Sequence, residues 1–156
     1  MKPNIEISEK NRQTVADILN TLLADEYVLY TQTRNAHWNI AGSNFCELHK
    51  FFESQYEILD VIIDDVAERI RSIGHYSLGS LKDFLELTRI DENKELSKEK
   101  EAIQVLLAGH ETIIQAIRKE IPSVTDKYAD LGTADFITGI MEQHEKMAWM
   151  LRAYLS

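Results

Sequence analysis

The sequence predicts an all-α fold: a four-helix bundle in which a long crossover joins the second and third helices and carries a short helix of its own. Apolar residues recur at three- and four-residue steps over four long stretches, the spacing of one buried helix face. Only a short turn separates the first two stretches, whereas residues 75–96 separate the second from the third. With 156 residues, 44% of them hydrophobic, and only two prolines and six glycines, the chain is sized for one domain, 1–156, with 1–10 as a short N-terminal arm.

The first two helices are predicted to form an antiparallel hairpin. The first runs from about Ser8 to Ile40, and its expected buried positions are Val15, Ile18, Leu19, Leu22, Leu23, Leu29 and Tyr30. The second begins after Asn44, a plausible N-cap, and Gly74 is well placed to end it. Because only a few residues lie between them, these helices should be neighbours in the bundle.

The crossover and the second hairpin follow from weaker signals. Ser80 is expected to cap a short helix at 81–87, the one regular stretch in the crossover. The third long helix should begin after Ser97 and end near Pro122, because proline disfavours helical backbone at the residue before it. The fourth should begin after residues 123–132, with Thr133 as its cap.

The charge and composition exclude several classes of protein. A formal net charge of −9 argues against a surface that attracts nucleic acid on its own, because phosphate binding needs clustered lysine and arginine, and no basic tail is evident. A single cysteine excludes an internal disulfide framework. The first residues show no apolar stretch typical of a signal peptide, and no run approaches membrane-spanning length. We therefore expect a cytoplasmic protein without a membrane partner.

Two histidines and two carboxylates point to metal chemistry. His37 and His49 would come from the same end of the first hairpin and could face each other, and Asp64 and Glu68 share a helix face four residues apart. At 1.5 Å per residue, however, His49 and Asp64 stand about 22 Å apart along their helix. One chain cannot close one site with all four, so we expect a second copy, packed antiparallel across a two-fold axis, to supply the missing pair.

The types of ligand narrow the choice of metal. Imidazole nitrogen and carboxylate oxygen suit divalent iron, manganese or zinc. Cys46 lies one helical turn before His49 and could approach the metal, although a lone cysteine is more often a small buried apolar residue. Ferritin-like di-iron proteins place a Glu-x-x-His pair inside the bundle, but none of the five histidines here has a glutamate three residues before it. His110 and His144 are expected in the core.

Three segments of the chain carry a family resemblance. They are Asn35-Ala36-His37-Trp38-Asn39-Ile40 with Gly42, Phe45, Leu48 and His49; Asp64, Ala67-Glu68-Arg69-Ile70 and Gly74; and Trp149-Met150-Leu151-Arg152-Ala153-Tyr154. In these segments the chain resembles the Dps family of mini-ferritins, the DNA-binding proteins from starved cells. The likeness extends over essentially the whole chain, and the combined motif is far more specific than any dipeptide within it.

The resemblance implies a ferroxidase. Members of the family form hollow dodecamers that oxidise ferrous iron with hydrogen peroxide or oxygen, store the ferric mineral inside and so protect DNA from oxidative damage. It assigns iron to a centre made by His37 and His49 of one subunit with Asp64 and Glu68 of another. Glu53 stands where many relatives have aspartate, and it is expected as an auxiliary ligand.

Other roles implied by the resemblance have plain alternatives. Trp38, next to His37, could donate an electron and quench an escaping radical, or simply pack against the interface. Tyr30 and Tyr56 are expected to be core residues. Acidic residues near the start of the last helix line pores in relatives, and Asp135 aligns best with them. Asp135, like Asp126 and Asp130 nearby, could instead flank or cap the helix.

A rival function is that of a DNA-compacting architectural protein with little oxidase activity, associated with the nucleoid. The family name favours it, but the acidic composition gives it little support, and bridging by divalent cations stays open. The sequence does not decide the preferred oxidant, the native metal or whether each centre holds one metal or two.

Overall fold

A computed structural model describes residues 3–156, and this part of the chain is helical. The elements are α1 (Glu9–Asn39), α2 (Phe45–Ser72), α3 (Leu81–Leu87), α4 (Glu99–Pro122), a π-helical turn η1 (Ser123–Lys127) and α5 (Leu131–Tyr154). The described residues contain no strand, only an isolated bridge between Ala41 and Lys98. No helix among them is long and apolar enough to cross a membrane. The all-α prediction is confirmed, while residues 1 and 2 of the expected arm lie outside the described residues.

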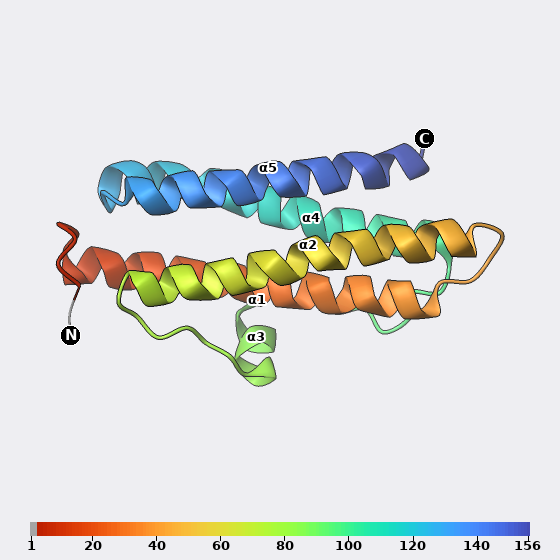
Figure 1. The fold of residues 1–156 in the computed structure, drawn as a ribbon, viewed down its shortest axis with the longest axis horizontal. Helices are drawn as coiled ribbons and strands as arrows, with labels where there is room; N and C mark the ends of the chain where they lie inside the picture. The colour runs from red at the N-terminus through yellow and green to blue at the C-terminus, as the bar shows by residue number, and fades with distance from the viewer. Residues whose placement is uncertain (1–2) are drawn as a thin grey trace.

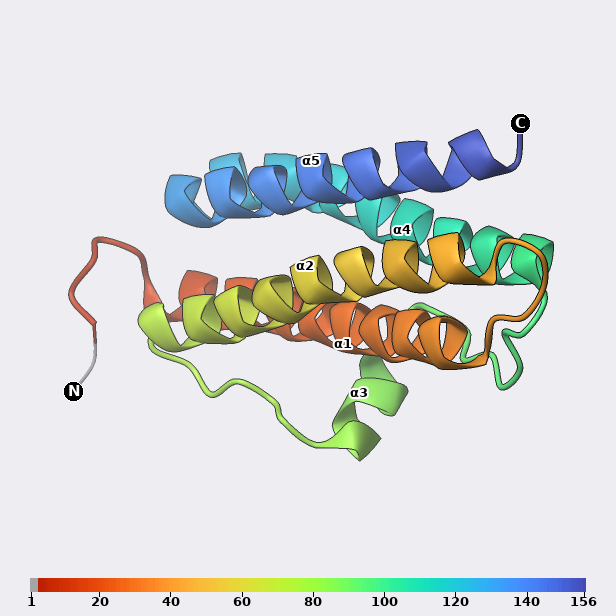
Figure 2. The same cartoon turned by 45° about the vertical axis from the view of Figure 1, so that its right-hand side comes forward.

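The four long helices form two antiparallel hairpins that lie against each other (Figure 1). α1 packs with α2, and α4 packs with α5. The segment after α2 returns the chain to the far end of the bundle, and α3 lies on it, outside the bundle and against α1 (Figure 2). This is the predicted bundle with a long crossover.

Local chemistry explains most of the helix ends. The Ser8 side chain accepts a hydrogen bond from the backbone N–H of Asn11 at the start of α1, and Ser80 accepts one from Asp83 at the start of α3. Gly74, at φ 94°, turns the chain just after α2 in a conformation that favours glycine. Asn44 holds the N-cap position of α2, but its side chain makes no capping hydrogen bond there.

One predicted helix end is wrong and another is confirmed. α5 begins at Leu131 rather than near Thr133, because Asp130 is the N-cap and accepts hydrogen bonds from both the backbone N–H and the hydroxyl of Thr133. α4 ends at Pro122, as predicted. The chain continues into η1, where the wider turn is closed by the N–H of Tyr128 donating to the carbonyl of Ser123.

One continuous apolar core fills the bundle. The largest fully buried side chains come from α1, α2, α4 and the segments beside them: Leu19, Leu23, Leu29, Leu48, Phe52, Leu59, Ile62, Ile70, Ile73, Leu96, Leu106 and Ile113. Each long helix thus presents a stripe of apolar residues to the others. The core holds the ends of the hairpins in fixed register, and this register positions the residues described next.

Candidate metal centre

The end of the first hairpin brings His37 and His49 together, as their spacing predicts. His37 lies near the end of α1 and His49 in the second turn of α2. Their rings stack 3.8 Å apart between centroids, with 21° between the ring planes. His37 is 7% exposed and His49 is half-buried. Two imidazoles from different helices therefore form one compact pair.

Reciprocal hydrogen bonds fix both rings. The Nδ1 of His37 lies 2.7 Å from the backbone carbonyl of His49, and the Nδ1 of His49 lies 2.8 Å from the carbonyl of His37. A carbonyl can only accept, so each Nδ1 must carry the hydrogen. In a neutral imidazole this leaves Nε2 unprotonated, with its lone pair available to a metal ion. The pair is therefore set in the tautomer that a metal centre requires.

The turn beneath the histidines is held by α4. Gly42 has φ 135°, and a Cβ at this position would lie 2.6 Å from Oε1 of Glu99, so any larger residue would be strained. The backbone N–H and the side-chain amide of Asn44 each donate to the Glu99 carboxylate at 3.0 Å. The N–H of Ala41 donates to the carbonyl of Ser97 at 3.1 Å. These contacts fix the relative position of α1 and α2 where the histidines meet.

Asp64 and Glu68 lie elsewhere on the molecule. Both are exposed on α2, on the same face as Val61, which is 59% exposed. Within residues 3–156 no group of three or more histidine, cysteine, aspartate or glutamate side chains lies close enough to hold a metal ion. A single chain therefore keeps the histidine pair and these two carboxylates apart.

Glu53 lies one turn after His49 and accepts a hydrogen bond from Tyr56, which we expected in the core. Tyr56 is half-buried, and its hydroxyl donates to Oε1 of Glu53 at 3.3 Å. Its ring stands edge-on to His37, 5.2 Å between centroids. Desolvation, together with the charge and hydrogen bond of Glu53, raises the pKa of Tyr56, so the phenol stays protonated. The spacing of Tyr56 on α2, seven residues after His49, was the signal for this contact.

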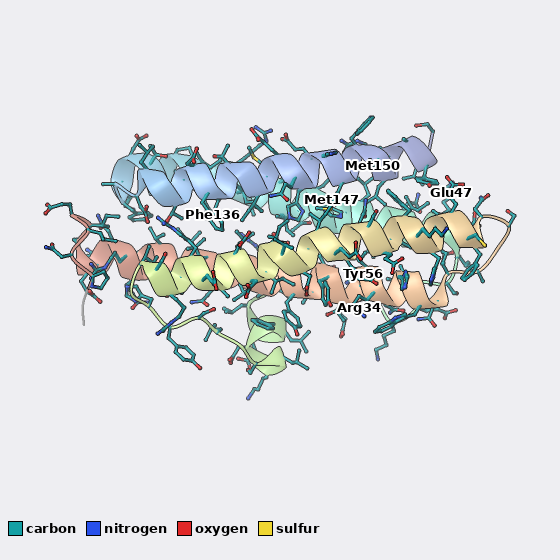
Figure 3. The ribbon with its side chains drawn as sticks, in the orientation of Figure 1. Arg34, Glu47, Tyr56, Phe136, Met147 and Met150 are labelled. Atoms are coloured by element: carbon teal, nitrogen blue, oxygen red, sulfur yellow. The ribbon has the colours of Figure 1, made fainter. Side chains whose placement is uncertain are left out.

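Arg34 is the other neighbour that sequence reasoning missed. Its guanidinium lies 4.6 Å from the ring centroid of Tyr56 and 5.3 Å from that of Trp38, and it donates to the Tyr30 hydroxyl at 2.7 Å. Figure 3 labels Arg34 and Tyr56, which lie close together on neighbouring helices. Its place on α1, one turn before His37 and Trp38, puts the cation among these rings. The hydrogen bond with Tyr30 raises the pKa of Arg34, so the group remains a cation.

Trp38 itself points away from the core. It is 63% exposed, and its indole is met by the Arg34 guanidinium. Cys46 is also exposed, so the expectation of a small buried residue is wrong. It lies in the first turn of α2, at the rim of the hairpin rather than in its interior.

The three aspartates near the start of α5 have different surroundings. Asp130 is buried, and besides capping α5 it pairs with Arg69 at 3.0 Å, which favours the structural alternative for this residue. Asp126 is exposed in η1, and Asp135 is exposed in the second turn of α5. Of the three, Asp126 and Asp135 have carboxylates that are open to solvent.

The predicted core histidines form a buried polar cluster with a glutamate. The Nδ1 atoms of His110 (α4) and His144 (α5) lie 2.9 Å apart, and Nε2 of His144 lies 2.9 Å from Oε1 of Glu26 (α1). All three side chains are fully buried. Burial and the neighbouring His144 lower the pKa of His110 well below its usual value. The cluster ties three helices together through one chain of hydrogen bonds.

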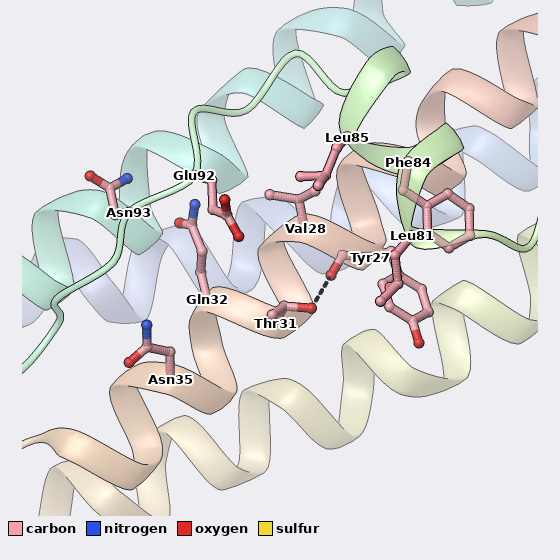
Figure 4. Close-up of a pocket in the computed structure, with 10 residues that line it drawn as sticks. All are labelled: Tyr27, Val28, Thr31, Gln32, Asn35, Leu81, Phe84, Leu85, Glu92 and Asn93. Carbon is pink, nitrogen blue, oxygen red and sulfur yellow. Dashed lines mark hydrogen bonds between the residues drawn. The ribbon is translucent and has the colours of Figure 1, made fainter.

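A shallow apolar pocket opens between α1 and the crossover (Figure 4). Its volume is about 170 Å³, and it is lined in part by Tyr27, Val28, Phe84 and Leu85. Tyr27 and Phe84 stack across its wall with centroids 4.7 Å apart. Leu85 and its neighbour Leu81 are largely exposed, so α3 carries apolar surface next to the pocket.

Comparison with known proteins supports a ferritin-like fold. Residues 16–156 match the model of the ferritin-like domain. An uncharacterised low temperature-induced protein of Nostoc is 39% identical over 97% of this chain and 86% of its own length. DNA protection during starvation protein 2 of Bacillus anthracis is 33% identical over 94% of this chain and 99% of its own.

Solved structures point the same way. The Dps protein of Vibrio cholerae, described as a member of a broad superfamily of ferritin-like diiron-carboxylate proteins, superposes with a TM-score of 0.93 at 32% identity. The match covers 100% of this chain and 98% of that one. From its fold, its paired histidines and these relatives, the chain belongs to the Dps family of ferritin-like proteins.

Proposed function

We propose that this protein is a ferroxidase that oxidises ferrous iron with hydrogen peroxide and stores the ferric product inside a hollow dodecamer. Ferrous iron and peroxide are its substrates, and protection of DNA follows from their removal. The ferritin-like diiron-carboxylate relatives support iron chemistry in general. The oxidant, the dodecamer and the residues assigned below are our proposal.

The reciprocal histidine pair is the observation that carries this proposal. Purely structural histidines would need no common tautomer, but His37 and His49 are both held with Nδ1 protonated and Nε2 free to bind a metal. Soft sulfur ligands are absent from this pair, so it suits ferrous iron. The pair still needs the carboxylates of Asp64 and Glu68, which within one chain lie far along α2.

A second subunit packed antiparallel would complete the centre with its own Asp64 and Glu68. Such a two-fold interface is isologous, so it would form two equal centres. Exposed apolar side chains support an assembly of this kind, among them Trp38, Val61 and Leu81. Glu53 would add a further carboxylate from the histidine side.

The carboxylate ligands of the proposed centre favour oxidation of the bound ferrous iron. Anionic oxygen stabilises ferric iron more than ferrous iron, so carboxylates favour the loss of an electron. Few protein ligands per iron leave positions open for peroxide. When two ferrous ions supply its two electrons, peroxide is reduced to hydroxide without release of a hydroxyl radical.

Iron needs a route into the shell, and we assign Asp135 to it. The side chain is exposed, and a three-fold axis would repeat one carboxylate into a strongly negative ring. The variant Asp135→Asn should slow the entry of iron and leave oxidation at a preloaded centre unchanged. Asp91→Asn, the same change of charge at an exposed position of the crossover, is the control.

The decisive experiment is to load the protein with ferrous iron without oxygen, add peroxide, and follow protein and iron through a sizing column. Ferric iron that elutes with a large assembly supports the proposal. Asp64→Asn should abolish fast oxidation, whereas the adjacent Asp65→Asn, with the same change of charge, should retain it. An assembly that emerges without iron, or an Asp64→Asn variant as fast as the parent, would contradict the proposal.

A further inference from the structure

Tyr56 is the tyrosine whose ring contacts the histidine pair. The T-shaped contact between Tyr56 and His37, 5.2 Å between centroids, places a phenol directly beside the proposed centre. The Tyr56 hydroxyl donates to Glu53, the proposed auxiliary ligand, so the phenolic hydrogen points towards that carboxylate. Trp38 is adjacent to His37 in sequence, but it is exposed and its ring is met by the Arg34 guanidinium.

The contact continues into a series of tyrosines. Tyr30 stands at 89° to Tyr56 with 6.2 Å between ring centroids, and Tyr27 follows Tyr30 at 6.1 Å. All three rings are half-buried; Tyr27 and Tyr30 come from α1 and Tyr56 from α2. Phenol rings in contact can pass an electron from one to the next. The series leads away from His37 along the hairpin.

Arg34 fixes the first two members of this series. It donates to the Tyr30 hydroxyl at 2.7 Å, and its guanidinium lies 4.6 Å from the Tyr56 ring. One cation thus contacts both phenols and restricts the motion of their rings. The restricted rings therefore stay in contact with each other. Arg34 is a positioning residue, because it touches the tyrosines rather than the metal ligands.

We propose that Tyr56, backed by Tyr30, quenches hydroxyl radicals formed at the iron centre. This inference rests on the proposed ferroxidase function and assigns the protective step to Tyr56 in place of Trp38. It concerns the case in which only one ferrous ion is bound when peroxide arrives. That ion can give one electron, so the O–O bond breaks to hydroxide and a hydroxyl radical while the iron becomes ferric.

The quenching step balances with the groups on hand. The hydroxyl radical takes the hydrogen atom of the Tyr56 hydroxyl, so this O–H bond breaks, an O–H bond of water forms, and Tyr56 becomes a neutral oxyl radical. An electron then passes from Tyr30 to Tyr56. Tyr30 releases its phenolic proton to solvent and Tyr56 takes one up, so the Tyr56 phenol is restored and the radical lies on Tyr30, farther from the iron.

The test uses the whole assembly, one ferrous ion per centre and peroxide, with freeze-quenched electron paramagnetic resonance to detect radicals. Optical absorbance of ferric iron is recorded on the same samples. The variants are Tyr56→Phe and Tyr30→Phe. Tyr154→Phe is the matched control, because the Tyr154 hydroxyl donates to Glu47 at 2.9 Å while its ring packs on Phe51 rather than on a histidine.

The parent protein and Tyr154→Phe should give the same tyrosyl signal. For the same amount of ferric iron formed, Tyr56→Phe should lose most of this signal and gain oxidised Trp38, seen by mass spectrometry as an added oxygen. Tyr30→Phe should keep the radical at Tyr56. Ferric iron without a tyrosyl signal in the parent, or a full signal in Tyr56→Phe, overturns this inference and leaves the proposed function intact. Failure of the parent to form ferric iron overturns both.

Discussion

Glu99, the first residue of α4, binds Asn44 through both carboxylate oxygens, each at 3.0 Å. One oxygen receives the backbone N–H of Asn44 and the other its side-chain amide. The same carboxylate occupies the space beside Gly42 where a side chain would begin. The second hairpin of the bundle thereby holds the turn on which both histidines depend.

Loss of this contact should weaken metal binding as well as stability. Glu99→Ala removes two hydrogen bonds and should lower the free energy of unfolding by about 1 kcal/mol, because exposed bonds contribute little each. Gly42→Ala should cost about 1–3 kcal/mol, because its positive φ and the nearby carboxylate both oppose a Cβ. Both variants should bind cobalt, used as an optical probe of the histidine pair, more weakly than the parent.

The control for Glu99→Ala is Glu101→Ala. Glu101 lies in the same helical turn and pairs with Lys98 at 3.0 Å on the exposed surface. Its removal should leave cobalt binding unchanged. Equal loss of cobalt binding in both variants would mean that the first turn of α4 acts through general stability and not through the hairpin turn.

Hybrid assemblies should reveal that the centre is shared between subunits. His37→Ala and Asp64→Asn should each be inactive alone. In a two-fold dimer of the two variants, one centre combines the altered histidine pair with the altered carboxylate pair. The other centre combines the unchanged histidines with the unchanged carboxylates, so it should oxidise iron. Mixed refolding of the two variants should therefore restore part of the parental rate of ferric iron formation.

A control mixture and one contrary outcome test this prediction. A mixture of His37→Ala with His49→Ala has no intact centre in any pairing and is the control that must stay inactive. If the first mixture also stays inactive while forming normal assemblies, the histidines and carboxylates do not meet across a two-fold axis.

The buried cluster should make stability depend on pH. The pKa of His110 is lowered on folding, so below its unfolded value of about 6.5 the unfolded chain binds more protons at this residue than the folded one. The stability contribution of neutral His110 is therefore present above pH 6.5 and is lost as the pH falls. The slope from this residue can reach about 1.4 kcal/mol per pH unit.

Replacement of His110 by leucine should flatten this acid dependence. The measurement is the free energy of unfolding in denaturant between pH 7 and pH 5, at one fixed subunit concentration because assembly adds its own stability. His75→Leu, a histidine outside the cluster, is the comparison. An unchanged slope in His110→Leu would show that the acid dependence arises elsewhere.

The acidic surface should keep DNA at a distance. With a formal net charge of −9, the protein should not shift duplex DNA in a gel at physiological salt without divalent cations. Added magnesium tests whether cations bridge two negative surfaces. Tight binding that weakens steeply with salt and needs no divalent cation would instead favour the DNA-compacting function.

The sequence alone predicted the features that depend on helical periodicity and on spacing along a helix. The helical period and the short turn after Ile40 predicted the hairpin, and the spacing of His37 and His49 placed both rings at its end. The long separation of His49 from Asp64 along one helix predicted that one chain cannot bring all four side chains together. That a second subunit completes the centre stays a prediction. These predictions rest on distances along a helix, which sequence fixes directly.

Sequence failed where competing local contacts decide the outcome. Asp130 and Thr133 could both cap α5, and Asp130, which holds the cap position, also pairs with Arg69, 61 positions away. Pro122 ends α4 as predicted, but the π-helical turn that follows it was not expected. Tyr56 looked like a core residue because apolar periodicity cannot distinguish a buried ring from one at the edge of a site.

The reciprocal bonds between His37 and His49 have a consequence for how this pair can change over time. Each ring is oriented by the main chain of the other residue, and that main chain keeps its place only while the two helices stay in register. Because the acceptor is a main-chain carbonyl, which any residue supplies, exchange of one histidine removes its own hydrogen bond and leaves that of its companion in place. The orientation of each ring is therefore inherited from the register of α1 and α2 rather than from the side chain of its partner.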